Sequence, residues 1–431
     1  MKIFMGITEI AGHYAKLKDG FVEMGVGCTF VDLFHHPFEY EYVKSKSILM
    51  RVKNLIIKKR SSLWEANFVS RYWWMGSWIV LNIVVFVYAA IKYDVFILGF
   101  NSSFRWSRGL PVLRFLNKKI ICRFHGADVR QPYMSGGIVA EDGKFNIEDI
   151  IKMSRKKKRQ LKRIERFADI VISNPLFSHL LECPFICATR IGIPCSNKAH
   201  KAVKYGGRGN ISQSNNKNIR ILHAPSHPAA KGTNEIRHII RRLEKKGYPL
   251  DYIEIQGKPN HVVLHELSRC DFVVDQLYSE TPMAGFVAEA ACFSKSAVVG
   301  GYASEAFNEV YPDGKIPPSN YCHPDSLESS ILKMIRDEDY RLELGRSAKK
   351  FVDENWTPKK VAKRYLQLIS NNIPKDWWYN PDDITYLHGS GLREAKAKKM
   401  IRSIVEVGGR DALQLSDKQK LESLFLEFAY S

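Results

Sequence analysis

The sequence has few acidic residues for its number of basic ones. Its 431 residues include 45 Asp and Glu against 65 Lys and Arg, which gives a formal net charge of +20. Such an excess favours anionic partners, namely nucleic acid, an acidic membrane face or a phosphorylated substrate. No nucleic-acid recognition motif accompanies the charge, so we do not expect a nucleic-acid partner.

Cysteine is also sparse, and its spacing argues against a zinc module. The closest group among the eight cysteines is Cys183, Cys187 and Cys195, which matches no common module. We therefore expect free, mostly buried thiols in a reducing compartment. No paired acidic motif for Mg²⁺ or Mn²⁺ is present, so we expect no metal. The segment Met1 to Ile7 is too short and too soon interrupted for a signal peptide, and we expect a cytoplasmic protein.

Long uncharged runs are rare, and one stands out between Trp73 and Ile91. Its length is borderline for a membrane span. Because Lys92 to Asp94 leads directly into a strand, we favour a buried crossover helix, then an interfacial helix, and a membrane span least. The basic segments Lys44 to Arg60 and Arg155 to Arg163 fit either solvated helix faces or contacts with the anionic inner face of the cell membrane.

Both halves of the chain alternate short apolar strands with helices. The expected strands cover 2–7, 28–33, 93–98, 119–124 and 169–173 in the first half, and 219–224, 250–257, 271–277 and 296–301 in the second. This spacing predicts an α/β fold with two parallel, doubly wound sheets. Ligands of such sheets bind at the carboxyl ends of the strands.

Composition predicts a linker between the two sheets. Residues 196–217 are rich in Gly, Asn, Ser and Lys and have no apolar period. We therefore expect an N-terminal Rossmann-like domain over 1–195, a C-terminal Rossmann-like domain over 218–371 and a helical extension over 372–431. Two such domains joined by a linker imply a cleft with a substrate between them.

The most informative motif is a Lys-Gly turn after the first strand of the second half. That strand breaks in a loop that contains Ser226 and His227, and Lys231-Gly232 then leads into an amphipathic helix, Ile236 to Lys246. Such a turn brings backbone N–H groups, the positive end of a helix and an ammonium to one point. It is a good site for a diphosphate.

Two further motifs follow strands at the same kind of sheet edge. His125 and Asp128 come directly after one strand and are expected to face the cleft, unless His125 only caps the next helix. Gly285 begins a helix whose N–H groups can bind phosphate, and Glu289 lies one turn further. Glu289 could be a plain helix residue, but its apolar neighbours favour a ligand or a partner for the carboxylate.

Together these motifs resemble the retaining glycosyltransferases of the GT-B fold. The matching family is the large bacterial one that makes polysaccharide and lipopolysaccharide, glycosyltransferase family 4 ("glycosyl transferases group 1"). The resemblance covers about Met1 to Asn371. It rests on Phe124–Asp128, Lys231–Thr233, Gln256–Pro259 and Asp275–Leu277 with Gly285 and Glu289.

The resemblance implies transfer of a sugar, with retention of configuration, from a nucleotide diphosphate sugar to a saccharide acceptor. The acceptor would be lipid-linked, in bacterial surface polysaccharide biosynthesis at the inner membrane face, and neither a cofactor nor a metal is implied. His125 would contact the donor sugar, Asp128 the acceptor side or the helix cap, and Glu280 the sugar hydroxyls. The implied donor-binding residues are Gly12, Ser226, His227, Lys231, Gly232, Gly257, Lys258, Thr281, Gly285, Phe286 and Glu289.

The sequence departs from the family pattern at two places. The family has two glutamates eight residues apart; Glu289 matches the second, whereas Thr281 takes the first position and Glu280 lies one residue early. The family also has an arginine a few residues before the lysine of the Lys-Gly pair, but here Ser226, His227 and Pro228 fill that stretch. Lys258 or Arg130 would then supply the second cation for the diphosphate. These departures leave a degenerate, non-catalytic partner subunit open as an alternative. A nucleotide-sugar 2-epimerase, which shares the fold, is a second alternative.

Overall fold

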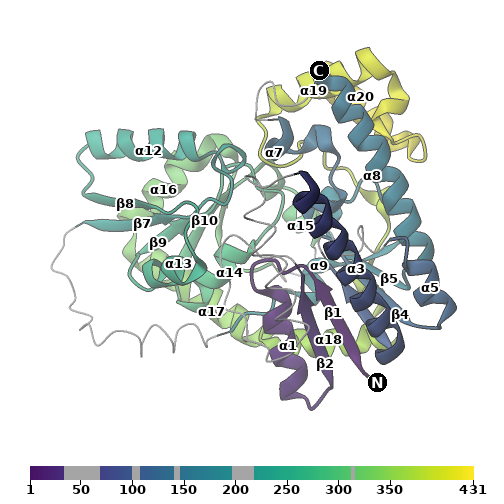
Figure 1. Cartoon of the computed structure of the whole chain (residues 1–431). Coiled ribbons are helices and arrows are strands. Elements are labelled where there is room, and N and C mark those ends of the chain that lie inside the picture. The colour runs from purple at the N-terminus through teal and green to yellow at the C-terminus, as the bar shows by residue number, and fades with distance from the viewer. Residues whose placement is uncertain (34–67, 100–106, 140–145, 197–217, 312–315) are drawn as a thin grey trace.

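The computed structural model describes residues 1–33, 68–99, 107–139, 146–196, 218–311 and 316–431. These residues form two α/β units, each built around its own sheet, with the C-terminal helices beside the first unit (Figure 1). The basic segment Lys44 to Arg60 and nearly all of the predicted linker lie outside the described residues.

The first sheet has seven strands in the order β12-β6-β5-β4-β3-β1-β2. All pairs are parallel except β12 with β6. The five predicted strands are present, whereas β6 and β12 were not predicted because each is only two or three residues long. The bounds are β1 (Ile3–Ile7), β2 (Cys28–Asp32), β3 (Val95–Leu98), β4 (Lys119–Arg123), β5 (Ile170–Ser173), β6 (Phe185–Cys187) and β12 (Trp378–Tyr379).

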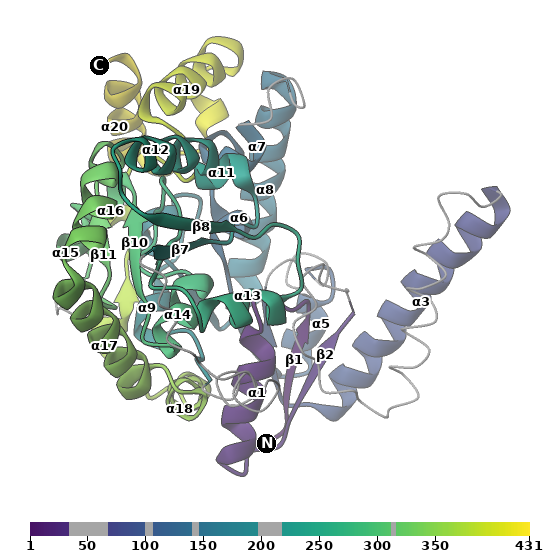
Figure 2. The same cartoon turned by 90° about the vertical axis from the view of Figure 1, so that its left-hand side faces the viewer.

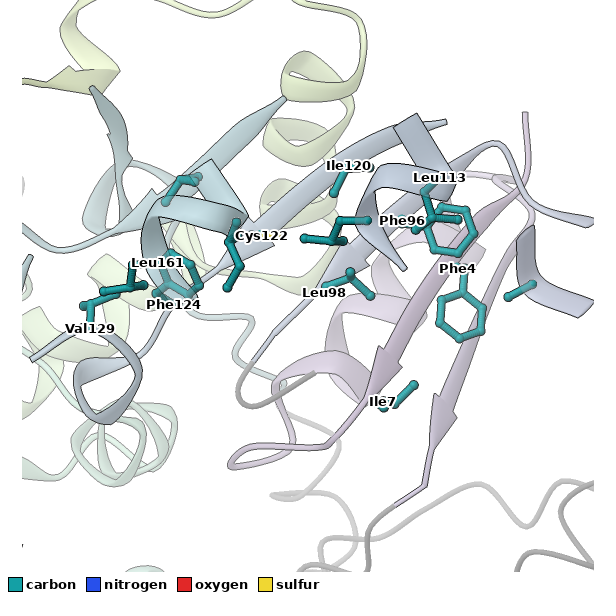
Figure 3. Close-up of a cluster of buried hydrophobic side chains, with 14 of the residues drawn as sticks. Phe4, Ile7, Phe96, Leu98, Leu113, Ile120, Cys122, Phe124, Val129 and Leu161 are labelled. Atoms are coloured by element: carbon teal, nitrogen blue, oxygen red, sulfur yellow. The ribbon is translucent and has the colours of Figure 1, made fainter. Parts of the chain in front are cut away.

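Successive residues of the central strands pack on opposite faces of this sheet. Phe4, Phe96 and Cys122 belong to the core cluster on one face, shown in Figure 3. Their strand neighbours Ile3 and Ile97 belong to a separate cluster on the other face. The period of two in a strand places alternate side chains on alternate faces, and both faces are buried, as a parallel sheet requires.

The second sheet has five parallel strands in the order β11-β10-β9-β7-β8. Its predicted strands are confirmed, and the short β11 is an addition. The strands are β7 (Ile219–His223), β8 (Leu250–Glu254), β9 (Phe272–Val274), β10 (Ser296–Gly300) and β11 (Asn320–Cys322), and the main helices are α12 (Thr233–Lys245), α13 (Asn260–Leu267), α14 (Gly285–Cys292), α16 (Leu327–Arg336) and α17 (Glu338–Asn355).

After the second sheet the chain returns to the first. Helix α18 (Pro358–Ile369) packs on α1 (His13–Glu23), and its Tyr365 is buried in the same core cluster as Ile3. A Cβ on Gly20 of α1 would lie 2.1 Å from the carbonyl oxygen of Pro358, so the two helices are in close contact. The predicted domain boundaries remain a prediction, but in space α18 completes the first core.

The C-terminal extension is helical, as predicted, and covers the first unit. Helices α19 (Glu394–Gly408) and α20 (Gln419–Tyr430) share a buried cluster with residues of α8 (Ile147–Phe167). The hydroxyl of Tyr133 donates to the carbonyl oxygen of Leu413 at 2.9 Å within this cluster. Figure 1 shows the extension beside α8, at the end of the molecule opposite the N-terminus.

The uncharged run forms helix α3 (Phe68–Lys92), and our prediction of a buried crossover helix is wrong. One stripe of the helix, which includes Trp78, Leu81 and Val85, is buried beside the first sheet. The opposite face is exposed, with Trp73 at 70% and Ile91 at 78%. Figure 2 shows α3 projecting from the body. An all-apolar helix has the same sequence signal whether one face or every face is covered, so composition could not decide this.

The basic cluster on α8 divides between two faces. Lys157 donates to the carbonyl oxygens of Ala127 at 2.7 Å and Arg130 at 3.0 Å. Lys158 pairs with the carboxylates of Glu182 at 3.1 Å and Asp417 at 2.9 Å. The remaining cations of the cluster are mostly exposed. Part of this cluster therefore holds the fold together, and its proposed contact with an anionic membrane stays a prediction.

Candidate active site

A cavity of about 200 Å³ lies at the carboxyl ends of the strands of the second sheet, where this sheet meets the first unit. Its wall consists of residues that follow β7, β8 and β9, together with one residue of the first unit. They are Ala224, Pro225, Ser226, Lys231, Ile255, Gly257, Lys258, Asn260, Val263, Asp275, Ala284, Gly285, Phe286 and Glu289, with Ala11 from the first unit. This is the sheet edge at which parallel α/β sheets bind their ligands.

The Lys-Gly turn directs an ammonium into this cavity. Lys231 ends the short helix α11 (Pro228–Lys231), and Gly232 is the cap residue between α11 and α12. Its φ is 69°, a left-handed conformation that favours glycine. A Cβ on Gly232 would also lie 2.6 Å from the Cβ of Leu277. The Lys231 ammonium lies 3.5 Å from a carboxylate oxygen of Asp275 and also donates to the side-chain oxygen of Gln276. These two residues follow β9 and hold the lysine in position.

Helix α14 presents its N-terminus to the same cavity. Its N-cap residue, Ala284, has no side chain that could bond the helix N–H groups, and the first helical bond runs from Ala288 to the Ala284 carbonyl at 3.0 Å. The N–H groups before Ala288 have no acceptor within the helix. A Cβ on Gly285 would lie 3.3 Å from the Cβ of Ala11, so the glycine lets the two units approach closely.

Glu289 lies one turn into α14 and joins the two units. One carboxylate oxygen accepts from the Lys16 ammonium at 3.2 Å, and the other accepts from the side-chain amide of Asn260 at 3.2 Å. Burial opposes the charge on Lys16, but the Glu289 carboxylate outweighs it and raises the pKa of the lysine. The prediction that Glu289 has a ligand or a partner is confirmed for the partner. Sequence reasoning missed Lys16. The feature that could have indicated a site residue is its position in the first turn of α1, directly after the loop that follows β1.

Two neutral histidines lie on the first unit near this loop. Burial and the charge of Arg123 lower the pKa of His125 to about 3, and burial holds the pKa of His13 well below its usual value. The two rings lie 6.1 Å apart, centre to centre. The Nε2 atoms of both rings are buried without a hydrogen-bond partner. Such unsatisfied polar atoms are rare in folded proteins.

Asp128 caps the short helix α6 (Gly126–Val129). Its carboxylate accepts from the backbone N–H of His125 at 2.9 Å, which is one of the two roles that the sequence suggested. The carboxylate therefore holds the backbone of His125 in place. Lys157 of α8 donates to the carbonyl oxygens of Ala127 within this helix and of Arg130 directly after it, and so fixes α6 to α8.

Glu280 is buried between the two units and is paired with Arg130. It is 2% exposed, and one of its carboxylate oxygens accepts from the Arg130 Nε at 2.8 Å, while a terminal guanidinium nitrogen contacts the other. A Cβ on Gly126 would lie 2.3 Å from the Arg130 guanidinium. The absence of a side chain at Gly126 therefore makes room for the Arg130 ion pair.

Seven of the predicted donor-binding residues line the cavity, namely Ser226, Lys231, Gly257, Lys258, Gly285, Phe286 and Glu289. The others do not line the cavity, and the structure gives them other positions or contacts. Gly12 follows the cavity residue Ala11, the His227 ring accepts from the Ala230 N–H at 3.3 Å, and the Thr281 N–H donates to the Ser279 hydroxyl at 3.2 Å. The predicted ligand contacts of these residues, and of His125, Asp128 and Glu280, stay predictions. Sequence reasoning missed Ala11, Asn260, Ile255, Val263 and the wall role of Asp275.

No metal cluster is found within the described ranges, where no three His, Cys, Asp or Glu side chains are grouped to hold an ion. The cavity instead combines cations, helix N–H groups and a paired carboxylate. The metal-free reaction remains a prediction, which rests on the cationic character of the wall.

Comparison with known proteins supports the architecture. No family model and no curated protein sequence matches the chain. A solved α,α-trehalose-phosphate synthase (UDP-forming) from Burkholderia vietnamiensis is similar with a TM-score of 0.52 at 10% identity, over 86% of this chain and 97% of that one. A trehalose-6-phosphate synthase studied for glycosyl transfer with retention gives 0.51 at 10% identity, over 87% and 100%.

The chain has a GT-B fold. The prediction of two doubly wound units that face one another, with a helical C-terminal extension, is confirmed. At 10% identity, the likeness to these structures concerns the GT-B architecture alone.

Proposed function

We propose that the protein transfers a sugar from a nucleoside diphosphate sugar to an acceptor hydroxyl with retention of the anomeric configuration. The observation that supports this proposal is the cavity wall at the edge of the second sheet. Lys231, Lys258 and the N-terminus of α14 form a cationic region, and Glu289 lies one helical turn away. That order of groups suits a diphosphate followed by a ribose.

The cationic region would bind and stabilise the leaving diphosphate. When the bond between the sugar and the diphosphate breaks, negative charge develops on the phosphate oxygens. Lys231 and the N–H groups that begin α14 are already in position before the reaction, and preorganised donors of this kind stabilise developing charge. Asp275 and Gln276 act as positioning residues because they hold the Lys231 ammonium.

The nucleoside would lie against the part of the wall that α13 and the end of β8 supply. Ile255 and Val263 provide apolar surface there. The Glu289 carboxylate would accept the ribose hydroxyls, and Lys16 and Asn260 hold it in one orientation. A carboxylate can accept about four hydrogen bonds, so these two donors leave room for a ribose.

The donor sugar and the acceptor would lie toward the first unit. Ala11 of the first unit is on the wall, and the same unit holds His13 and His125, whose buried Nε2 atoms have no hydrogen-bond partner. Neutral imidazoles can donate to or accept from sugar hydroxyls without adding positive charge. In this arrangement His125 contacts the donor sugar, and Asp128 positions it through its backbone N–H.

The acceptor that we propose is a lipid-linked saccharide of a bacterial surface polysaccharide, met at the anionic inner face of the cell membrane. The basic character of the chain and the exposed apolar face of α3 support this choice. A soluble acceptor is the alternative, and an activity assay with soluble and lipid-linked saccharides would separate the two.

The test of the donor site is calorimetric titration of nucleoside diphosphates into wild-type protein, Lys231→Ala and Lys245→Ala. Lys245 is an exposed residue at the other end of α12 and serves as the matched control. We expect Lys231→Ala to weaken binding by about a hundredfold, since a charge-assisted contact contributes about 1.5–3 kcal/mol. The control should bind normally. Equal affinities in all three proteins would refute the assignment.

The reaction is tested with nucleotide sugars and saccharide acceptors, and the anomeric configuration of the product is read by nuclear magnetic resonance. A product that keeps the donor configuration supports the proposal. Release of the free nucleotide without an acceptor-linked product would indicate the 2-epimerase alternative. An absence of nucleotide binding in the wild type would indicate the non-catalytic subunit.

A further inference from the structure

Helix α3 has an exposed apolar face, and none of its residues lines the cavity of the candidate active site. Its exposed side chains include Trp73, Ile79, Val80, Ile83 and Ile91, each at least 56% exposed. The segment Tyr72–Lys92 is long and apolar enough to cross a membrane, yet only 28% of its most apolar window is buried. Contiguous apolar surface of this kind marks an interaction site, because it is costly to leave in water.

The buried stripe of α3 determines which face is available. Trp78, Leu81, Val85 and Ala89 recur at intervals of three and four residues and pack into the core beside the first sheet. This stripe attaches the helix to the body along several turns. An amphipathic helix that lies alone on a membrane has one apolar face toward lipid and one polar face toward water. In α3 the face opposite the exposed apolar one packs against the protein core, so this face is apolar as well.

A neighbouring helix extends the apolar surface. Helix α5 (Leu110–Phe115) follows Gly109, where a Cβ would lie 2.5 Å from the Phe86 ring of α3. Leu110 and Leu113 of α5 share the core cluster of α3, whereas Phe115 is 85% exposed. The exposed apolar surface therefore comes from two adjacent helices.

The charges and aromatic groups of these helices suit a lipid surface. Neither α3 nor α5 contains an acidic residue. Lys92 ends α3, whereas Arg114 of α5 is paired with the carboxylate of Asp169. Tyr72, Trp73 and Tyr88 are exposed on α3, and such side chains favour the boundary between lipid and water. Exposed interfacial aromatics on an apolar face that carries no acidic residue favour a lipid surface over a protein partner.

The topology argues against a single membrane crossing by α3. Strands β2 and β3 lie on either side of β1 in one sheet, so the chain leaves the body after β2 and returns to the same body at β3. One crossing by α3 would require a second crossing within residues 34–67. That stretch has no uncharged run longer than Phe34 to Phe38, far below the roughly 20 apolar residues that a crossing needs.

We infer that the exposed faces of α3 and α5 insert into the interface of an anionic bilayer, with α3 lying along the membrane surface and not across it. The inference deepens the proposed function, because it names the surface that would bring the cleft to a lipid-linked acceptor. It does not depend on the sugar chemistry, since the buried stripe and the exposed face are present whatever the cleft binds.

The test is flotation of the full chain with vesicles of phosphatidylethanolamine and phosphatidylglycerol, at low and at high salt. The test variant carries Val80→Glu, Ile83→Glu and Val87→Glu on the exposed face of α3. The control variant carries Val22→Glu, Leu342→Glu and Val407→Glu, which are apolar residues of similar exposure on three other helices. Both variants leave the core intact, and equal thermal stability would verify this.

We expect the wild type and the control to float at both salt concentrations, because insertion of apolar side chains is not screened by salt. The α3 variant should bind vesicles more weakly by at least about tenfold. Equal binding of all three proteins, or no binding by the wild type, would overturn the inference. Loss of wild-type binding at high salt would show a purely electrostatic contact and would overturn it as well.

Two further measurements decide between an interfacial helix and its rivals. Lipids brominated near the headgroup should quench tryptophan fluorescence more than lipids brominated near the chain end, and Trp73→Phe should reduce that quenching. Stronger quenching by the deep label would indicate a crossing.

A wild-type dimer that the α3 variant abolishes, without vesicle binding, would identify a second copy of the chain as the partner. We expect the nucleotide affinity to be equal in the wild type, the α3 variant and the control. A failure of membrane insertion is then distinguishable from a failure of the proposed glycosyl transfer.

Discussion

The buried ion pair between Arg130 and Glu280 allows a sharp test of what Glu280 does. The resemblance assigns this carboxylate to sugar hydroxyls, whereas the structure pairs it with the guanidinium of the other unit at 2.8 Å. The two side chains are 12% and 3% exposed, so water screens the pair little. The perturbations are Glu280→Gln, Arg130→Met and the double variant, which form a double-mutant cycle.

The size of the effect follows from burial. Removing one partner of a buried pair leaves the other charge uncompensated, which costs about 3–5 kcal/mol of unfolding free energy. Replacing both partners removes both desolvation costs, so the double variant should be less destabilised than the sum of the two single variants. We expect a coupling energy of about 2–3 kcal/mol. Gly126 lies beside the same guanidinium, and the space left there is the same in both variants that lack Arg130.

The assay is urea denaturation of the four proteins, followed by calorimetry with a nucleoside diphosphate and the matching nucleotide sugar. If the pair joins the two units, the coupling is large and Glu280→Gln weakens both ligands to a similar extent. If Glu280 contacts the sugar, Glu280→Gln weakens only the nucleotide sugar. A coupling energy near zero together with a loss specific to the sugar would refute the structural reasoning.

Two predictions concern other carboxylates. Glu289→Gln should weaken nucleoside diphosphate and nucleotide sugar alike, by about tenfold in calorimetry, because it removes a charged acceptor for the ribose; a loss confined to the nucleotide sugar would contradict this role. Burial raises the pKa of Glu9 from 4.5 to about 7, although it accepts N–H bonds from Ile10, Tyr14 and Ala15. The folded state therefore binds this proton more tightly than the unfolded state. The contribution of Glu9 to the free energy of unfolding is fully present below about pH 4.5. It falls by on the order of 3 kcal/mol as the pH rises to about 7. Glu9→Gln should show a flatter stability profile between these pH values in urea denaturation, and an unchanged profile would exclude Glu9 as the source.

The sequence by itself determined the features that neighbouring residues encode. Runs of β-branched residues at regular spacing indicated two parallel sheets, and the structure confirms them. The Lys231-Gly232 turn was visible because glycine in a left-handed conformation is a local requirement. Gly285 and Glu289 are four residues apart, which on a helix places them on one face, and both line the cavity.

Only the tertiary structure decided the contacts between distant segments. Lys16 with Glu289 and Arg130 with Glu280 join residues of two units whose relative placement no local pattern contains. Helix α18 lies near the end of the chain but completes the first core. The exposure of α3 depends on which elements pack over it, and its composition is the same in either case. Periodicity and turn chemistry act over a few residues, whereas the pairing of buried charges depends on how whole units pack against each other.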